Sequence, residues 1–199
     1  MPDERESKSS LDALRLSNEE SKKFTKKCLL GALLRLVRKK PFEKISISEL
    51  VSQAGVSRTA FYRHYNAIED VIKEPVFEIL EAIKSSLNDE KYCKEPFVWY
   101  VDLLLYLKEN KEVLETLMII TNGQMVTLGV LDEIFESGSE GERARYEMEA
   151  FKGGISSALA RWIADGYTAS PQTVAEICCQ IQNSMGIALK NSRGGEDFC

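Results

Sequence analysis

Residues 54–65, AGVSRTAFYRHY, gather two arginines, three aromatic rings and the only histidine of the chain into twelve positions. Arg58 and Arg63 carry planar guanidinium groups, which can form paired hydrogen bonds with a phosphate or with the edge of a guanine base. Tyr62 and His64 can donate hydrogen bonds to phosphate oxygens. This stretch therefore offers the chemistry of nucleic-acid recognition.

Two short helices and a turn are needed to position these side chains. Ser46-Ile47-Ser48-Glu49 has the S-x-x-E pattern of a capping box, which predicts a helix start, and Gly55 suits the left-handed position that ends a helix. Ser57 can cap a further helix that runs through Phe61 to Tyr65. Two helices joined by a glycine-containing turn are typical of a helix-turn-helix, whose second helix enters the major groove of DNA.

The position of each polar residue on these helices suggests its role. Arg58 and Thr59 fall in the first turn of the second helix, where side chains meet base edges, and Arg63 follows on the same broad face. Ser46 offers a hydroxyl and neighbouring amides to a phosphate, and Lys44 adds charge beside it. The candidate DNA-binding residues are Lys44, Ser46, Ser57, Arg58, Thr59, Tyr62, Arg63 and His64.

Some nearby side chains have a structural alternative. Tyr62 either contacts phosphate or packs as a half-buried ring, whereas Phe61 and Val56 are expected to hold the two helices together. Lysines at positions 22, 23, 26 and 27 form either a solvated helix face or a flank for DNA. The charge distribution favours DNA: residues 21–74 hold twelve of the 26 basic residues and five of the 31 acidic ones, although the whole chain has a net charge of −5.

Helical patterns dominate the rest of the chain and predict an all-α fold of about nine helices. A capping box at Ser17–Glu20 predicts a first helix that ends near residue 39, before Pro41. Residues 1–16 are expected to form a disordered polar tail, residues 17–66 a three-helix DNA-binding domain, and residues 67–199 a helical bundle.

An aromatic-rich helix in the bundle is the candidate site for a small molecule. The segment EPFVWYVDLLLYLKEN is apolar around most of its circumference, which predicts burial at the bundle centre. Its rings either form plain core or line a pocket, because both uses need the same residue types. The candidate pocket residues are Trp99, Tyr100, Leu103, Tyr106, Met118 and Phe135. Few charges occupy this lining, so an uncharged effector is favoured.

Composition and missing motifs exclude several function classes. No stretch approaches the roughly 18 apolar residues of a membrane span, and the polar start lacks a signal-peptide core, so we expect a cytoplasmic protein without membrane contact. The five cysteines lack C-x-x-C spacing, and the chain has no H-E-x-x-H, P-loop or G-x-G-x-x-G motif. We therefore expect no enzymatic activity, no cofactor and no metal.

Residues 44–72, KISISELVSQAGVSRTAFYRHYNAIEDVI, resemble the DNA-binding signature of TetR/AcrR-family transcriptional regulators. The likeness runs without a gap and includes Ala54-Gly55-Val56-Ser57 at the turn, Phe61-Tyr62 and His64-Tyr65. It departs at Ala60 and Ile68, where the family commonly has a hydroxyl residue and a lysine.

The resemblance implies a homodimeric regulator, usually a repressor, that binds a near-palindromic double-stranded operator and is released by an effector in the later helices. It also implies that the last two helices form a four-helix interface with their mates. Their apolar stripes give the candidate interface residues Phe151, Ile155, Leu159, Trp162, Ile177, Cys178, Ile181 and Met185.

Two alternatives stay open. Residues 151–177 loosely resemble a TetR subgroup that includes regulators of dihydroxyacetone kinase operons. In this alternative, a regulatory protein replaces the small apolar effector, and the chain acts as a regulator or coactivator. A structural or protein-binding helical module is the other alternative, and it predicts no salt-dependent DNA binding.

Overall fold

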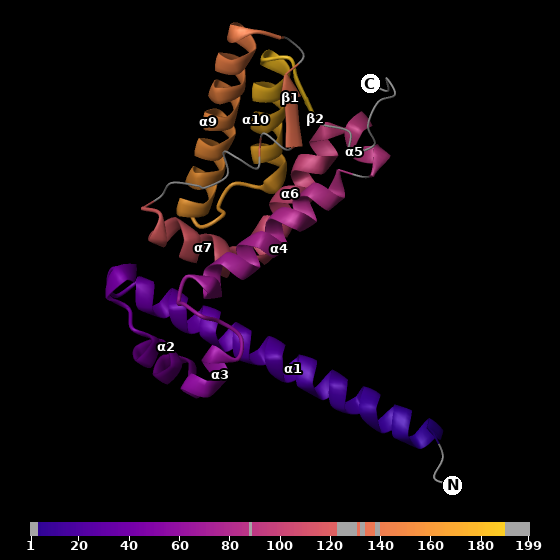
Figure 1. The fold of residues 1–199 in the computed structure, drawn as a ribbon. Helices are drawn as coiled ribbons and strands as arrows, with labels where there is room; N and C mark the ends of the chain where they lie inside the picture. The colour runs from indigo at the N-terminus through magenta and orange to yellow at the C-terminus, as the bar shows by residue number, and fades with distance from the viewer. Residues whose placement is uncertain (1–3, 88, 123–130, 132–133, 138–139, 190–199) are drawn as a thin grey trace. The chain divides into compact units, whose positions relative to one another are not determined.

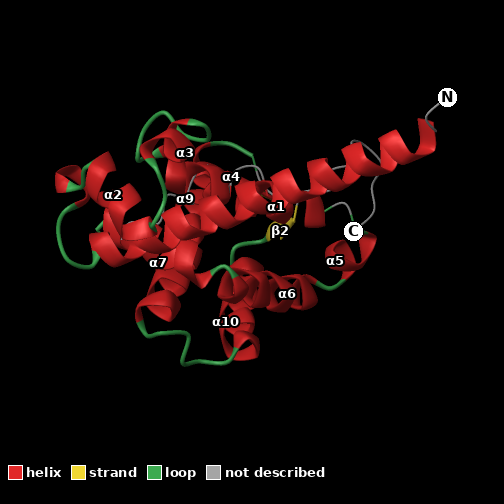
Figure 2. Cartoon of the chain, turned by 90° about the horizontal axis from the view of Figure 1, so that it is seen from below, coloured by secondary structure: helices red, strands yellow, loops and turns green. Residues whose placement is uncertain are grey.

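The computed structural model describes residues 4–87, 89–122, 131, 134–137 and 140–189 (Figure 1). The expected all-α class is confirmed, because helices make up most of the described chain (Figure 2). The chain divides into two compact units, Met1–Lys73 and Glu74–Cys199, and each is described by itself. This division falls a little beyond the expected domain boundary at residues 66 and 67.

Helix α1 supplies the core of the N-terminal unit. The elements here are α1 (Glu4–Val37), the 3-10 helix η1 (Phe42–Lys44), α2 (Ile47–Ala54) and α3 (Arg58–Tyr62). Helix α1 packs against α2, which packs against α3. Leu29, Leu33, Leu50 and Phe61 are completely buried, so one apolar cluster joins all three helices.

The start of α1 corrects the sequence expectation. We expected a polar tail over residues 1–16 and a helix start at the capping box of Ser17, but α1 begins at Glu4. Residues 4–16 contain no glycine or proline and are rich in good helix formers, and extending an existing helix costs far less than nucleating one. A capping pattern therefore marks a start only where the preceding chain cannot continue the helix.

The C-terminal unit is a helical bundle around α6. Its helices are the remainder of α4 (Asp70–Ser86), α5 (Glu90–Lys94), α6 (Pro96–Glu109), α7 (Lys111–Ile120), α9 (Glu142–Ala164) and α10 (Pro171–Ser184). Helix α6 packs against α5, α7 and α10, which confirms its expected central position. Ser170 caps α10 through the Thr173 amide, with Pro171 at the first helical position, also as expected.

A two-stranded antiparallel sheet is present that the sequence did not predict. Strand β1 (Phe135–Ser137) pairs with β2 (Ile187–Leu189), with Phe135 opposite Leu189. Three residues are too few to show the alternation by which a strand is recognised. Helix α10 ends at Ser184, and Gly186 takes a left-handed φ of 63° before β2 begins. Met185, expected on the last helix, is its C-cap.

Candidate nucleic-acid interface

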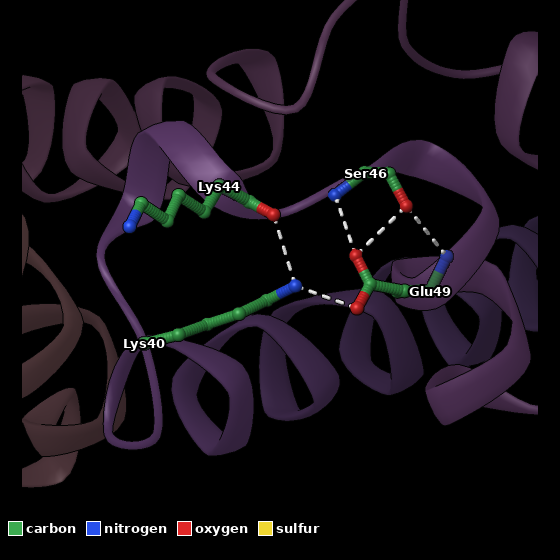
Figure 3. Close-up of polar contacts among 4 residues, drawn as sticks. All are labelled: Lys40, Lys44, Ser46 and Glu49. Carbon is green, nitrogen blue, oxygen red and sulfur yellow. Dashed lines mark hydrogen bonds and ion pairs between the residues drawn. The ribbon is translucent and has the colours of Figure 1, made fainter.

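The first turn of α2 is held by a capping box (Figure 3). The Ser46 hydroxyl accepts a hydrogen bond from the Glu49 amide at 3.3 Å, and the Glu49 carboxylate accepts one from the Ser46 amide at 3.0 Å. Lys40, just after α1, donates to the same carboxylate at 2.5 Å and to the Lys44 carbonyl oxygen at 2.9 Å. These bonds join the end of α1, η1 and the start of α2.

The charge on Glu49 is stabilised by its donors. The hydrogen bond from Lys40, followed by those from the amide and hydroxyl of Ser46, lowers the pKa of Glu49 to about 2. A carboxylate at a helix start also complements the partial positive charge of the helix dipole. Glu49 therefore remains ionised at neutral pH.

The same cluster places Lys44 and Ser46, two of the predicted phosphate contacts, beside α2. The Ser46 hydroxyl, which was predicted to contact a phosphate, donates to Glu49 at 2.8 Å, so its proton already has an acceptor. The Lys44 side chain is exposed and extends away from Glu49 (Figure 3). The charge of Lys44 is thus exposed to solvent, whereas the hydroxyl of Ser46 caps α2.

The turn between α2 and α3 has the predicted geometry. Gly55 adopts a φ of 67°, in the left-handed region that favours glycine, and the Val56 amide donates to the Val51 carbonyl oxygen at 3.0 Å. Ser57 caps α3 by accepting from the Ala60 amide at 3.0 Å. The predicted helix-turn-helix is therefore confirmed in its local structure.

Helix α3 presents one buried and one exposed face. The Phe61 ring is fully buried and meets the Tyr62 ring at a centroid distance of 5.3 Å. Tyr62 is 50% exposed, and Arg58 and Thr59 are also exposed, so these side chains can reach a ligand in solvent. Tyr65 is buried, so its ring packs inside the N-terminal unit.

The length of α3 differs from the prediction. The helix was expected to reach Tyr65, but it ends at Tyr62, with Arg63 as its C-cap and His64 in the following turn. A hollow of about 370 Å³ brings Arg63 and His64 together with Lys22 of α1. The sequence does not predict that Lys22 lies near Arg63, because the two residues are about forty positions apart.

Two arginines contact α2. An Arg58 guanidinium nitrogen donates to the Ser48 hydroxyl at 3.3 Å, which uses one of the five N–H donors of that group and fixes it beside α2. Arg35 of α1 donates to the carbonyl oxygen of Gln53 at 3.3 Å, near the C-terminal end of α2. Arg58 and Arg35 thus each tie a neighbouring helix to α2.

The predicted pocket residues divide between two hollows in the C-terminal unit. Trp99, Tyr100, Leu103 and Phe135 line an apolar chamber of about 70 Å³. Tyr106 instead lines a neighbouring hollow between α4, α5 and α6. On α7, Leu114 and Leu117 supply the chamber wall, where the sequence had suggested Met118.

The predicted interface residues on α9 need correction. Phe151, Ile155, Leu159 and Trp162 are at most 6% exposed, so they pack in the core of their own bundle and offer little surface to a partner. Cys178 on α10 is also fully buried, whereas Ile177 is 44% exposed, and Ile181 and Met185 are half-buried. An apolar stripe shows which face of a helix is buried, but not whether its own chain or a second one covers it.

The described residues were expected to contain neither a membrane-spanning helix nor a metal site. No helix in the part of the chain that the structure describes has both the length and the apolar character of a membrane span. Within the same residues, no three His, Cys, Asp or Glu side chains group as metal ligands would.

Comparisons with known proteins agree with this geometry. Residues 29–74 match the family described as bacterial regulatory proteins, tetR family. A solved structure of a TetR transcriptional regulator from Streptococcus agalactiae 2603V is similar in fold, with a TM-score of 0.50 and 15% sequence identity over 84% of this chain and 98% of that chain. No curated protein matches the sequence. The subgroup resemblance of residues 151–177 is not confirmed, because the family match ends at residue 74.

Proposed function

We propose that this chain is a TetR-like transcriptional repressor that binds a near-palindromic DNA operator as a homodimer and is released by an effector in its C-terminal unit. The exposed polar face of α3, fixed from behind by the buried Phe61, is the observation that carries the proposal. The family match over residues 29–74, which includes α2 and α3, supports it.

Recognition of DNA divides between base and backbone contacts. Arg58 and Thr59, at the start of α3, read base edges in the major groove, since an arginine can form two hydrogen bonds with guanine. Phosphate contacts fix the register of the protein on the duplex without reading sequence. The residues proposed for these phosphate contacts are Lys44, Ser46, Ser57, Tyr62, Arg63 and His64.

The homodimer uses the solvent-facing side of α9 and α10. Tyr146 is 70% exposed, and Ala150 and Gly153 follow it on α9 at helical spacing. The Cβ position of Gly154 lies 3.6 Å from the side chain of Ile181 on α10, so small residues here allow the two helices to approach closely. Ile177 supplies an exposed apolar contact on the same pair of helices.

Effector control follows from linkage. An effector changes DNA affinity only through its different affinities for the DNA-competent and DNA-incompetent states. Helix α4 begins in the N-terminal unit and continues into the C-terminal unit, where Val76, Ile79 and Ile83 line the chamber. A ligand that displaces α4 would change the separation of the two recognition helices, which successive major grooves fix at about 34–36 Å or a multiple.

Control by a regulatory protein is the second candidate. The described chamber of about 70 Å³ has room for only a few methylene-sized groups, so a large effector would need the bundle to open. A protein partner requires no such chamber. A thermal-shift screen of small molecules distinguishes these candidates, because only the first predicts hits that lose their effect in Trp99→Ala.

Operator binding is the direct test of the proposal. Selection of bound duplexes from a random library should return a near-palindrome, and its affinity should exceed that for random competitor DNA by roughly a thousandfold or more. Affinity should also fall steeply as salt rises, because phosphate contacts release counterions. Equal binding to all duplexes, or binding that ignores salt, contradicts the proposal.

A further inference from the structure

A second hollow lies beside the apolar chamber in the C-terminal unit. It has a volume of about 170 Å³ and shares Ile83, Trp99 and Leu103 with the chamber wall. Its full lining is Ala82, Ile83 and Ser86 of α4, Tyr92 of α5, and Trp99, Asp102, Leu103 and Tyr106 of α6. A molecule in this hollow would therefore touch the same side chains that bound the chamber.

The lining combines one charge with three aromatic rings. Of its eight residues, Asp102 alone has an acidic or basic side chain of the Asp, Glu, Lys or Arg type. The Tyr92 hydroxyl donates to the Asp102 carboxylate at 2.8 Å, and the Trp99 indole N–H donates to the Ser86 hydroxyl at 2.9 Å. The rings of Tyr92, Trp99 and Tyr106 thus share the lining of this hollow with one carboxylate.

A positive group already occupies the edge of this arrangement. The Lys91 ammonium lies 3.6 Å from an Asp102 oxygen and 4.3 Å from the centre of the Tyr92 ring. A carboxylate and an aromatic face are the two partners that stabilise an organic cation. Both Lys91 and Asp102 have side chains about half exposed, and such ion pairs contribute little, so an incoming cation can displace the lysine.

Two further acidic residues act electrostatically on Tyr106, one of the rings in the lining. Burial raises the pKa of Tyr106, and the charges of Glu78 and Glu109 raise it further. These acids increase the negative potential around Tyr106, and its phenol stays neutral at physiological pH. An anionic ligand would be repelled here, and an uncharged one would gain nothing from the charge of Asp102.

We propose that the hollow between α4, α5 and α6 binds the ammonium group of a mainly apolar organic cation, whose body lies along Ile83, Trp99 and Leu103. The assignment rests on the effector role proposed above and names the chemical class of the effector. It revises the uncharged effector favoured by the sequence, because Asp102 stands on an apolar helix and was not recognised as part of a site.

Three probes of equal chain length test this charge preference. Hexyltrimethylammonium, 1-hexanol and hexanoate are titrated by calorimetry into the full chain without DNA. The cation should bind about tenfold more tightly than the alcohol, and hexanoate should bind least tightly, because only the cation gains the attraction of Asp102. Equal affinities for the three probes would overturn the proposal.

Two variants of opposite effect locate the site. Asp102→Asn should lower the affinity for the cation about tenfold and leave the affinity for 1-hexanol unchanged. Lys91→Met should raise the affinity for the cation about threefold, because it removes the ammonium group that competes for Asp102. Glu112→Gln is the matched control, because it removes an exposed carboxylate of α7 outside this hollow. It should leave the affinities for the cation and for 1-hexanol unchanged. Unchanged cation affinity in Asp102→Asn, with normal thermal unfolding, rejects the site.

Operator binding in the presence of each probe separates the two proposals. If the cation binds and Asp102→Asn weakens it, the site stands even when the operator complex is unaffected, and the proposed effector role then fails. If the chain binds its operator but shows no preference for the cation, DNA binding stands and this site is rejected.

Discussion

The Lys40 ammonium lies 2.5 Å from a carboxylate oxygen of Glu49, nine residues further along the chain. The contact connects the residues after α1 with the first turn of α2, the helix that precedes the recognition helix. It therefore adds a polar link between the segment after α1 and the start of α2, beside the apolar packing of these two helices.

Replacing Lys40 should loosen this connection. Lys40→Met is expected to lower the melting temperature, because it removes the hydrogen bonds to Glu49 and to the Lys44 carbonyl oxygen. Lys39→Met, the matched control, removes the same charge from an exposed neighbour and should have a smaller effect. Equal melting temperatures in the two variants would show that the contact contributes nothing.

The folding stability of the chain should depend on pH through the carboxylate of Glu49. Its pKa is depressed to about 2 in the folded chain, against about 4.3 in an unfolded one. The stabilisation is therefore complete above about pH 4.3 and is lost as the pH falls toward 2. The difference in melting temperature between wild type and Glu49→Gln should shrink over this range and in high salt, because the carboxylate is exposed. A difference that stays constant from about pH 6 to about pH 3 contradicts this assignment.

Loss of the cap should be separable from loss of a DNA contact. Ser46→Ala is expected to cost about 1 kcal/mol of stability, because the Glu49 amide loses its acceptor. Affinity should then fall alike for all DNA sequences, since a phosphate contact carries no base information. Chemical denaturation and gel shifts measure the two effects, and a change of base preference in this variant would show that Ser46 reads sequence.

Base reading should depend on the start of α3. Arg58→Ala is expected to lose about 1–3 kcal/mol of discrimination at one base pair of each half-site. Tyr62→Phe keeps the ring and removes the hydroxyl, so it should lower the affinity for every duplex by a similar factor. Competition assays with single base-pair changes measure both variants, and identical specificity profiles for wild type and Arg58→Ala would exclude a base contact.

The two faces of the last long helices should respond differently to substitution. Ile177→Asp should dissociate the dimer without unfolding the protomer, because Ile177 is exposed on α10. Phe151→Ala should instead destabilise the protomer by about 3–5 kcal/mol, because its ring is fully buried. Sedimentation and thermal unfolding separate these effects, with Asn183→Asp as a control on another exposed face of α10. An unchanged dimer in Ile177→Asp would place the interface elsewhere.

The sequence by itself determined the features that depend on neighbouring residues. The capping box of α2, the Gly55 turn and the Ser57 cap each join atoms within a few positions, so their pattern predicts their geometry. The burial of Phe61 also follows from its place between exposed polar residues on one short helix.

Only the tertiary structure decided which surfaces meet. The stripe that begins at Phe151 is turned toward its own bundle, and Lys22 lies near Arg63. Tyr106 lines the second hollow, whereas Tyr100, on the same helix, lines the apolar chamber. Each of these relationships depends on residues that are distant in sequence, and helical periodicity gives the direction of a face but not its partner.

The pairing of β1 with β2 was decided in the same way. Phe135 and Leu189 lie opposite each other across the two strands although more than fifty residues separate them in the chain. An isolated pair of three-residue strands is at best marginally stable in water, so the surrounding bundle must bring the two segments together. No local pattern in either segment could therefore have predicted the sheet.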